Sequence, residues 1–402
     1  MLLTWAASSG LNPTLSLDFL TPVLDGRITA SGGANGTRVN SSGLIVAATT
    51  PRFDYDPVTL DIRGLLVEEA RTNLLLYSDD FTGAAWATQG TANVTANTVQ
   101  DTDAATASNR YQDVTIANDS STRVAQWRVA KNQAQIVALQ HQVFGGTPVN
   151  YAIALNTATG AYNTASTLGS DPGANATVTD AGGFWLVTIV LANNSTGNTT
   201  ARQRFYPAYA SSLGGGSTVA DVTLTGTATC RYMGLELGSF ATSYIPTVGA
   251  TVTRTADSLT MTGTNFSSWF NASEGTFVVE FEPPAVLSTF PVLLGHDSGS
   301  TAGMYLFSNA VGHWNGSVDL SLAETVIQGV SNKMALAFSG TTSRAIALNG
   351  GTVAEDANSA GSFDGLFFGK PGGAASQVLN SHIRSLRYYP RRLTNAQLQV
   401  LT

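Results

Sequence analysis

The residues from Phe184 to Leu191 read FWLVTIVL, and this stretch decides the class of the fold. Positions 185, 187, 189 and 191 are all apolar, and Thr188 is the single polar residue at the alternate positions. Side chains of a β-strand point alternately to the two faces of its sheet, so this strand is apolar on both faces. Such a strand is typical of the interior of a sheet. We therefore predict a central strand of a β-sandwich at this point of the chain.

Short β segments continue on both sides of this stretch, from Trp86 to about Pro246. They are separated by clusters of Gly, Asn, Asp and Thr, which favour turns. The stretch Val124–Phe144 is long enough for two strands, and Arg231–Leu237 would supply the closing strand. Regularly spaced short strands with turn signals between them predict an all-β sandwich.

A second β domain is predicted from about Phe277 to the last residue. Its expected strands are Thr276–Glu282, Val292–Gly295, Met304–Phe307, Val318–Leu322, Met334–Phe338, Ala345–Leu348 and His382–Tyr388. Asn349-Gly350 is a typical hairpin turn, because both residues accept positive φ. Thr394, followed three residues later by Gln397, forms the pattern of a capping box, which predicts a short helix beginning at about Asn395.

The chain before the first sandwich has a different texture. Residues 1–63 are rich in turn formers and contain few long apolar segments, so we expect them to pack against another part of the assembly. Residues 64–76 place apolar side chains at 66, 67, 70 and 74, which indicates a short helix or an extended connector. The predicted fold is therefore mainly β, with an N-terminal region (1–76), two antiparallel β-sandwich domains (77–248 and 249–402) and a short C-terminal helix.

Charged residues make up 12% of this 402-residue chain, where about 25% is usual. The net charge is −7 and there are no long basic runs, whereas binding to nucleic acid or to an anionic membrane surface needs clustered Lys and Arg. We therefore expect neither partner, and no apolar run approaches the roughly 18–20 residues needed to insert into a bilayer. One cysteine, Cys230, cannot form an internal disulfide, and four scattered histidines predict no zinc site.

Several motifs resemble a known family of virion proteins. Pro51–Pro57, Arg63–Leu75 and Tyr77–Phe81 look like the N-terminal module of fibre and head-spike proteins of tailed bacteriophages and prophages. Gly238–Thr247 is similar to the end of the jelly-roll domain in such proteins. Ser381–Thr394 resembles the last strand and cap of a concanavalin-A-like or laminin-G-like sandwich. These motifs lie at the beginning, middle and end, so the resemblance spans most of the chain.

The resemblance implies a structural protein of the phage particle: a fibre, head-spike or decoration subunit. It implies that residues 1–76 serve attachment and oligomerisation, that the chain forms a homo-oligomer, a trimer being favoured, and that it contacts other virion proteins. The two sandwiches would bind host cell-surface polysaccharide at the particle surface, after synthesis in the host cytoplasm. No reaction and no cofactor are expected. Two alternatives stay open: a tailspike-type polysaccharide depolymerase, and a capsid decoration protein without receptor activity.

Sugar binding requires exposed aromatic rings beside amide, hydroxyl or carboxylate groups, because a sugar has an apolar C–H face and a ring of hydroxyls. Two clusters offer this combination. The candidate residues are Tyr305, His313, Trp314 and Asn315 in the second sandwich, and Tyr206 and Tyr209 in the first. One of the two tyrosines in the first sandwich must point away from the core. Packing in the core or at a subunit interface is the alternative for both clusters.

The depolymerase alternative requires a pair of carboxylates, about 5 Å or about 6.5–9.5 Å apart. Glu280 with Glu282, and Asp54 with Asp56, have the spacing of two that places side chains on one face of a strand. Acids that alternate along a strand are, however, more often simply its solvent-exposed face. The sequence therefore predicts no catalytic residue.

The remaining candidates are charged residues. Asp79 and Asp80 offer oxygen ligands for a structural Ca²⁺, although a capped turn explains them as well. The candidates for contacts with other subunits are Glu68, Arg71, Arg384, Arg387, Arg391 and Arg392. The four C-terminal arginines would meet an anionic polysaccharide or an acidic protein surface, or would protect an exposed edge strand from aggregation.

Overall fold

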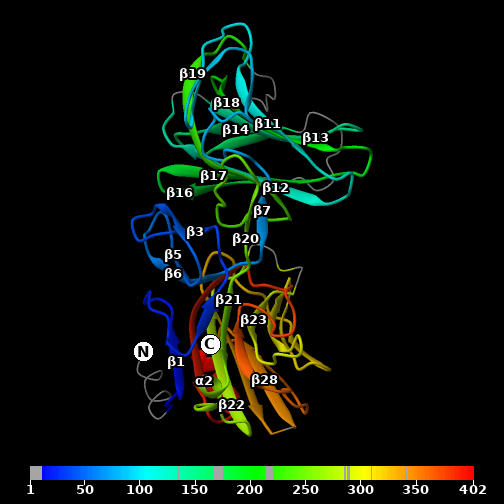
Figure 1. The fold of residues 1–402 in the computed structure, drawn as a ribbon. Helices are drawn as coiled ribbons and strands as arrows, with labels where there is room; N and C mark the ends of the chain where they lie inside the picture. Colours follow the sequence, from blue (N-terminus) through cyan, green and yellow to red (C-terminus); the bar gives the residue numbers. More distant parts are fainter. Residues whose placement is uncertain are drawn as a thin grey trace. The chain divides into compact units, whose positions relative to one another are not determined.

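The computed structural model describes residues 11–133, 136–165, 175–213, 221–284, 287, 290–308, 310–340 and 342–402. The chain divides into two compact units, which Figure 1 shows with their strands labelled. Unit 1 consists of the residues up to Ala34, Arg38–Ala70 and Thr255–Thr402, and unit 2 consists of Asn35–Thr37 and Arg71–Arg254. This division differs from the predicted one into three consecutive parts. The N-terminal residues belong to the same unit as the C-terminal sandwich.

Unit 1 contains two antiparallel sheets with one apolar core between them, so it is a β-sandwich. The strands of the eight-stranded sheet are, in spatial order, β29 (Val353–Asp356), β28 (Ser343–Leu348), β27 (Asn332–Ser339), β22 (Glu274–Phe281), β31 (Ser381–Tyr389), β6 (Ile62–Val67) and β5 (Arg52–Tyr55), with β1 (Leu15–Asp18) also paired to β31. The strands of the seven-stranded sheet are β2 (Thr29–Ser31), β21 (Ser258–Thr262), β30 (Gly365–Phe368), β23 (Val292–Gly295), β24 (Gly303–Phe307), β25 (Ala310–Trp314) and β26 (Asp319–Leu322). All seven strands predicted from about Phe277 onward are present, with ends that differ by up to two residues.

A short C-terminal helix, α3 (Asn395–Leu401), covers part of the outer face of the eight-stranded sheet. It buries Leu398 against the small side chains of Ala335, Ala337, Ala345 and Ala347. At its start the Thr394 side chain accepts a hydrogen bond from the backbone N–H of Gln397, whose side chain accepts one from the Thr394 N–H. The capping box is therefore confirmed. A second helix, α2 (Thr264–Ser267), is a single turn.

The N-terminal strands belong to the C-terminal sandwich. In β31, His382 pairs with Leu66 of β6, while Tyr388, further along the same strand, pairs with Leu15 of β1. The apolar side chains of these N-terminal strands lie in the same core as those of residues 259–388. Residues 62–67 and 71–73 are extended in β6 and β7, so the helical interpretation of 64–76 was wrong and the extended alternative holds.

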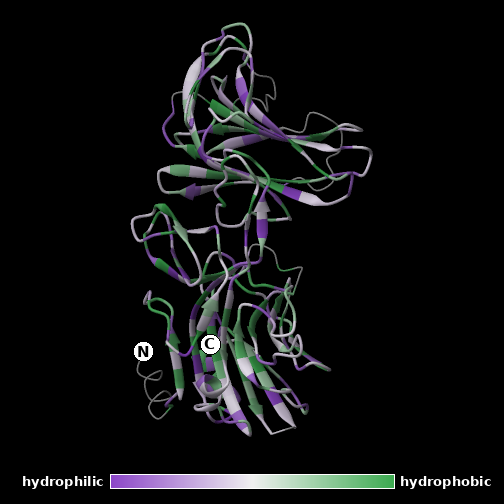
Figure 2. Ribbon diagram, in the orientation of Figure 1, coloured by the Kyte–Doolittle hydropathy of each residue, from purple (hydrophilic) through white to green (hydrophobic). Residues whose placement is uncertain are grey.

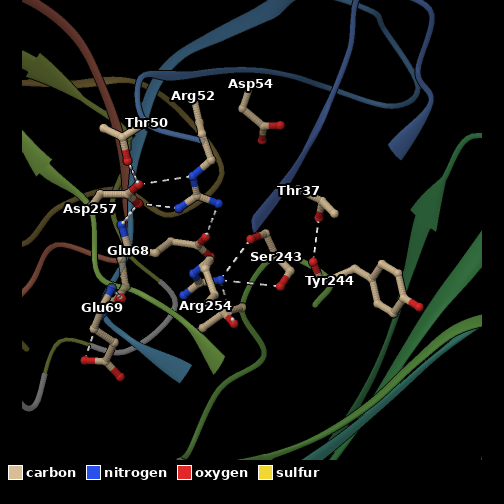
Figure 3. Close-up of polar contacts among 12 residues, drawn as sticks. Thr37, Thr50, Arg52, Asp54, Glu68, Glu69, Ser243, Tyr244, Arg254 and Asp257 are labelled. Carbon is tan, nitrogen blue, oxygen red and sulfur yellow. Dashed lines mark hydrogen bonds and ion pairs between the residues drawn. The ribbon is translucent and has the colours of Figure 1, made fainter. Parts of the chain in front are cut away.

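A buried charge cluster secures this arrangement. Figure 3 shows the Arg52 guanidinium of β5 between the carboxylates of Glu68 and Asp257. Asp257 Oδ2 also accepts a hydrogen bond from the Glu68 backbone N–H at 2.8 Å, and Arg52 and Asp257 are both fully buried. Burial by itself lowers the pKa of Arg52, but the two carboxylates raise it above its ordinary value. Arg52 therefore keeps its charge in the folded protein.

Unit 2 is also a β-sandwich, with two six-stranded antiparallel sheets and one core. The strands of its first sheet are β16 (Asn175–Ala181), β17 (Phe184–Ala192), β12 (Thr122–Ala130), β19 (Gly226–Leu237), β10 (Thr98–Asp101) and β9 (Ala92–Thr95). The strands of its second sheet are β15 (Tyr162–Ala165), β14 (Val149–Asn156), β13 (Ile136–Phe144), β18 (Thr200–Ala210), β11 (Asn109–Thr115) and β8 (Ala87–Gln89). A small sheet of unit 2 pairs β7 (Arg71–Asn73) with β20 (Val252–Arg254). Another two-stranded sheet pairs β3 (Gly36–Val39) with β4 (Ile45–Ala48), and β4 belongs to unit 1.

The stretch 184–191 forms β17, which is hydrogen-bonded to a strand on each side. Val187, Ile189 and Leu191 are buried in the core, whereas Trp185 is only partly buried, with its ring 4.3 Å below the Lys131 ammonium group. Leu186, Thr188 and Val190, which point to the other face, are also only partly buried. The strand is therefore interior to its sheet but not covered on both faces. Figure 2 shows the same alternation of hydrophobic and hydrophilic residues along many strands. In the part of the chain that the structure describes, no helix is long and apolar enough to cross a bilayer.

Candidate functional site

Polar and aromatic side chains line the outward face of β11, β18 and β13 in unit 2. Pairing across the three strands creates two rows, Tyr111–Arg204–Gln140 and Asp113–Arg202–Gln142. Because side chains alternate, the intervening Gln203 and Phe205 of β18 point into the sandwich, where both are fully buried. We call the surface of Tyr111, Asp113, Gln140, Gln142, Arg202, Arg204 and Tyr206 the Arg204 face.

One half of the Arg204 face is organised by Arg202. Its guanidinium pairs with the Asp113 carboxylate, with 2.6 Å between Nη2 and Oδ2, and it lies 4.3 Å from the centre of the Tyr111 ring and 4.9 Å from that of Phe144. The hydrogen bonds that Arg202 donates to Asp113 raise the pKa of Arg202 above its ordinary value. This half of the face is thus electrically balanced, and it holds the Tyr111 ring in place.

The other half is organised by Arg204, which has a different set of partners. Its Nη1 group donates to Gln140 Oε1 at 2.9 Å and to the Tyr206 hydroxyl at 3.4 Å, and its guanidinium lies 5.6 Å from the Tyr111 ring centre. Its Nε is buried and has no hydrogen-bond partner among the described residues. Arg204 therefore joins an amide, a phenol and an aromatic ring on one partly exposed surface.

The end of this face carries Tyr206 and Tyr209. A register shift in the pairing of β18 with β13 lets both rings lie 5.4 Å apart in a small cluster with Ile136 and Ala138, separate from the main core. Tyr209 is only 9% exposed, and burial raises the pKa of its hydroxyl, whereas Tyr206 is partly exposed. Tyr206 thus faces away from the core, and Tyr209 packs behind it rather than offering a second platform.

The structure divides the candidate cluster of unit 1. Tyr305 lies on the outward face of the seven-stranded sheet, where its hydroxyl donates to Asp319 Oδ1 at 2.7 Å and its ring lies over Gly312. Trp314 is partly exposed two residues away in register. Phe290, which is 43% exposed, approaches Tyr305 edge-on at 6.0 Å. These rings form a second, more apolar surface.

His313 and Asn315 do not contribute to that surface. His313 is fully buried: its Nε2 lies 2.9 Å from His296 Nε2, and its Nδ1 lies 3.1 Å from Arg344 Nη1. Burial lowers the pKa of His313 well below its ordinary value. Asn315 stabilises a turn, with its Oδ1 accepting from the N–H groups of residues 317 and 318. Both residues serve the fold, because strand alternation turns His313 away from its neighbour Trp314.

The predicted carboxylate pairs are engaged in ion pairs or turns. A bulge in β31 places Arg384 between Glu280 and Glu282, at 3.3 Å and 3.2 Å, and Arg63 Nε bonds the far oxygen of Glu282 at 2.8 Å. Both carboxylates are therefore engaged in ion pairs with arginines of the same sheet. The members of the second pair have separate roles. Beside a bulge in β6, Asp54 accepts from His382 Nε2 at 3.0 Å. Asp56, the other member of the pair, instead accepts hydrogen bonds from backbone N–H groups of the turn that follows it.

The two candidate calcium ligands also have other roles. Asp79 accepts two hydrogen bonds from the Arg231 guanidinium and one from the Tyr232 backbone. Asp80 accepts from the backbone and hydroxyl of Thr82, which makes it the cap of a turn. The capped-turn alternative therefore holds for Asp80. Among the described residues, no group of three or more His, Cys, Asp or Glu side chains is arranged to hold a metal ion.

The candidate interface residues are distributed differently from the expectation. Glu68 and Arg71 are buried, Glu68 beside Arg52 and Arg71 with its guanidinium 4.7 Å from the Phe240 ring centre. β31 is a central strand, so its arginines do not protect an edge. Arg384 is held by Glu280 and Glu282, and Arg392 pairs with Glu355 at 3.2 Å. Arg387 and Arg391 are exposed and remain candidates for contacts with a partner.

Sequence reasoning identified Tyr206 but missed the residues beside it. The segment 201–206 reads ARQRFY, so a spacing of two places Arg202, Arg204 and Tyr206 on one face, opposite the buried Gln203 and Phe205. That alternation was a usable signal. The contribution of Tyr111 and Gln140 had no such signal, because it depends on pairing between strands that are far apart in the sequence.

Comparisons with known proteins give partial structural likenesses. No protein-family model and no curated protein matches the chain. A carbohydrate-binding module, CBM40, of the Ruminococcus gnavus IT-sialidase, solved with α2,3-sialyllactose, is 17% identical with a TM-score of 0.30, over 34% of this chain and 86% of that one. Domain 4 of the Geobacillus stearothermophilus arabinanase AbnA, solved with arabinotriose, is 12% identical with a TM-score of 0.29, over 36% and 72%. The binding domain of botulinum neurotoxin DC, solved in complex with SialylT, is 9% identical with a TM-score of 0.28, over 36% and 39%.

Proposed function

We propose that this chain binds carbohydrate through the Arg204 face without cleaving it. The observation that carries the proposal is the arrangement of the partly exposed Tyr206 ring, the Tyr111 ring, the Gln140 amide and the Arg204 guanidinium on one outward sheet face. Aromatic rings stack on the C–H face of a sugar, and amide and guanidinium groups bond its hydroxyls. The face therefore offers both kinds of contact that sugar recognition needs.

The biological setting is also a proposal. The motifs in residues 51–81, 238–247 and 381–394 resemble phage fibre and head-spike proteins. We place the chain on the surface of a phage particle, in contact with other virion proteins and assembled as a homotrimer. Its ligand there would be a host cell-surface polysaccharide.

Binding without hydrolysis is supported by the carboxylates. The pair that the depolymerase alternative requires, Glu280 and Glu282, is held by Arg384 and Arg63. A glycosidase needs one carboxyl group that gives a proton to the leaving oxygen and one that acts as base or nucleophile. Two carboxylates fixed in ion pairs suit a structural role in the sheet better than these tasks.

The test is binding of the full chain to a panel of bacterial capsular and O-antigen polysaccharides, measured by biolayer interferometry. We expect at least one polysaccharide to bind, and Tyr206→Ala to weaken that binding at least tenfold. A matched control is Tyr162→Ala: Tyr162 is 39% exposed on β15 of the same sheet and pairs with Leu155, whose side chain lies in the core. Equal loss in both variants, or none in Tyr206→Ala, would refute the assignment of the face.

Two further readouts address activity and assembly. The size distribution of the bound polysaccharide is followed by gel filtration during a long incubation, and we expect no shortening. Clear shortening would favour the depolymerase instead. Multi-angle light scattering at micromolar concentration should give three times the monomer mass, and a monomer would refute an intrinsic trimer.

A further inference from the structure

We infer that the Arg204 face selects acidic polysaccharides, with a sugar carboxylate pairing to the Arg204 guanidinium. This inference rests on the proposed function and names the class of ligand that the same face would take. The inference requires a positive charge on the face, whereas binding of a neutral sugar would not require one. Three features of the face support it: the charge balance of the face, the free donors of Arg204, and the groups that hold this side chain in place.

The first feature is the balance of positive and negative side chains on the face. On the outward side of β11, β13, β14 and β18, the described charged residues are Asp113, Arg202 and Arg204. Asp113 is paired with Arg202 through two hydrogen bonds, so these two charges cancel. The charge of Arg204 is left over. The face therefore carries one uncompensated positive charge in a chain whose net charge is −7.

The second feature is the set of hydrogen-bond donors on the Arg204 guanidinium. Three other arginines of unit 2, Arg123, Arg202 and Arg231, each pair with an aspartate at 2.5–2.9 Å. Arg204 has only neutral acceptors among the described residues, the Gln140 amide and the Tyr206 hydroxyl, and both bind Nη1. Its Nη2 group donates to no described residue. Charge-assisted bonds to a carboxylate are stronger than bonds to neutral oxygen, so an anion is the favoured ligand for these donors.

The third feature is the fixed position of the Arg204 guanidinium. Gln140 holds Nη1 from one neighbouring strand, and the Tyr111 ring lies beside the guanidinium from the other. The buried Nε cannot reach solvent, so a carboxylate would approach the Nη edge. The Tyr206 hydroxyl accepts from Nη1, which leaves its own proton able to point to the ligand. A held guanidinium loses little side-chain entropy on binding, which favours affinity.

The experiment compares polymers that differ only in charge. The probes are size-matched oligomers of polygalacturonic acid and of α2,8-linked polysialic acid, each with its carboxyl-reduced counterpart, and binding to the full chain is measured at 50 and 200 mM NaCl. We expect at least one acidic polymer to bind at least tenfold more tightly than its reduced form. The preference should shrink at the higher salt concentration, because salt screens charge–charge attraction.

Variants assign the preference to a residue. Arg204→Gln keeps polar groups but removes the charge, and it should lower affinity for the acidic polymer at least tenfold and affinity for the reduced polymer by a much smaller factor. Arg204→Lys should keep part of the preference. The control is Lys333→Gln, which also removes one positive charge, from a partly exposed position of β27 in unit 1, and should change neither affinity.

The outcomes separate this inference from the proposed function. Equal affinity for acidic and reduced polymers, or equal loss in Arg204→Gln and Lys333→Gln, would overturn the inference. If instead the polysaccharide panel yields a neutral ligand whose binding is lost in Tyr206→Ala, the proposed function stands and the acidic specificity falls. If no polysaccharide of any kind binds, both fall together.

Discussion

Acidification should destabilise unit 1 through two histidines that the fold keeps neutral. Arg344 donates from Nη1 to His313 Nδ1 at 3.1 Å, and a guanidinium cannot accept, so His313 must carry its proton on Nε2. That proton is donated to His296 Nε2 at 2.9 Å, and the His296 Nδ1–H in turn donates to the Ser362 carbonyl at 2.8 Å. This chain of hydrogen bonds accommodates no additional proton.

The size of the effect follows from the pKa values. Burial lowers the pKa of His296 from its ordinary 6.5 to about 4, and burial lowers that of His313 well below 6.5 as well. The unfolded chain therefore binds protons that the folded chain excludes. The contribution of the two neutral histidines to the free energy of unfolding is therefore fully present above about pH 6.5, and it falls as the pH is lowered from there toward 4. One pKa unit corresponds to about 1.4 kcal/mol, so His296 alone accounts for a loss of about 3 kcal/mol by pH 4.

The carboxylate that pairs with Arg344 does not oppose the trend in that window. Asp356 pairs with Arg344, and although burial by itself raises its pKa, the hydrogen bonds from Arg344 and Asn358 lower it below the ordinary 3.8. A carboxylate with a lowered pKa loses its contribution only as the pH falls below its unfolded value. Between pH 6.5 and 4 the histidines therefore set the sign of the change.

The assay is hydrogen exchange followed by mass spectrometry at pH 7.5, 6.0 and 5.0, with rates corrected for intrinsic exchange. Peptides from β25 and β30 report on unit 1, and we expect their protection against global opening to decrease by about tenfold per pH unit per histidine below pH 6. In His296→Phe, which retains an aromatic ring beside Phe363 but cannot titrate, the dependence should be shallower. Protection at pH 5.0 as large as at pH 7.5 would refute the reasoning.

Three further substitutions test the packing. Asp257→Ala leaves Arg52 with one of its two carboxylates, so we expect the free energy of unfolding in urea to fall by about 3–5 kcal/mol, and a loss below 1 kcal/mol would contradict a buried ion cluster. His141→Leu should leave the melting temperature unchanged or higher, because both ring nitrogens are buried without a hydrogen bond to a described residue; a marked decrease would reveal a partner. Thr394→Ala removes the cap of α3 and should cost about 1 kcal/mol in the same urea titration, whereas no change would show that the helix does not contribute to stability.

Features with local signals could be predicted from the sequence. The strand Val292–Gly295 was predicted with its observed bounds, and the helix begins at Asn395 as the capping box indicated. Asn349-Gly350 forms the expected turn, with φ angles of 48° and 74°. Each of these depends on a few neighbouring residues, so the chain needs no distant partner to reveal it.

Features that depend on distant pairing could not be predicted. The pairing of Leu15 with Tyr388 joins residues at opposite ends of the chain, and nothing local to residues 1–63 identifies that partner. The direction of Tyr209 was obscured by the register shift in β18, since strict alternation places it on the face opposite Tyr206. His313 was predicted to belong to a sugar-binding cluster, but it points into the core, while Gly312 on the other face makes room for the Tyr305 ring.

In a chain with few charged residues, a buried charge cluster can select how strands that are distant in the sequence pair. An apolar strand that slips by two residues keeps the same side chains facing the core, so hydrophobic burial alone selects the register weakly. Arg52 on β5 cannot slip in this way, because a shift of two residues would carry its guanidinium roughly 7 Å from the Asp257 and Glu68 carboxylates and leave buried charges unpaired. Replacing such a cluster with apolar residues can be neutral for stability, yet separating its members is costly. We infer that this cluster selects the register of the N-terminal strands within the sandwich.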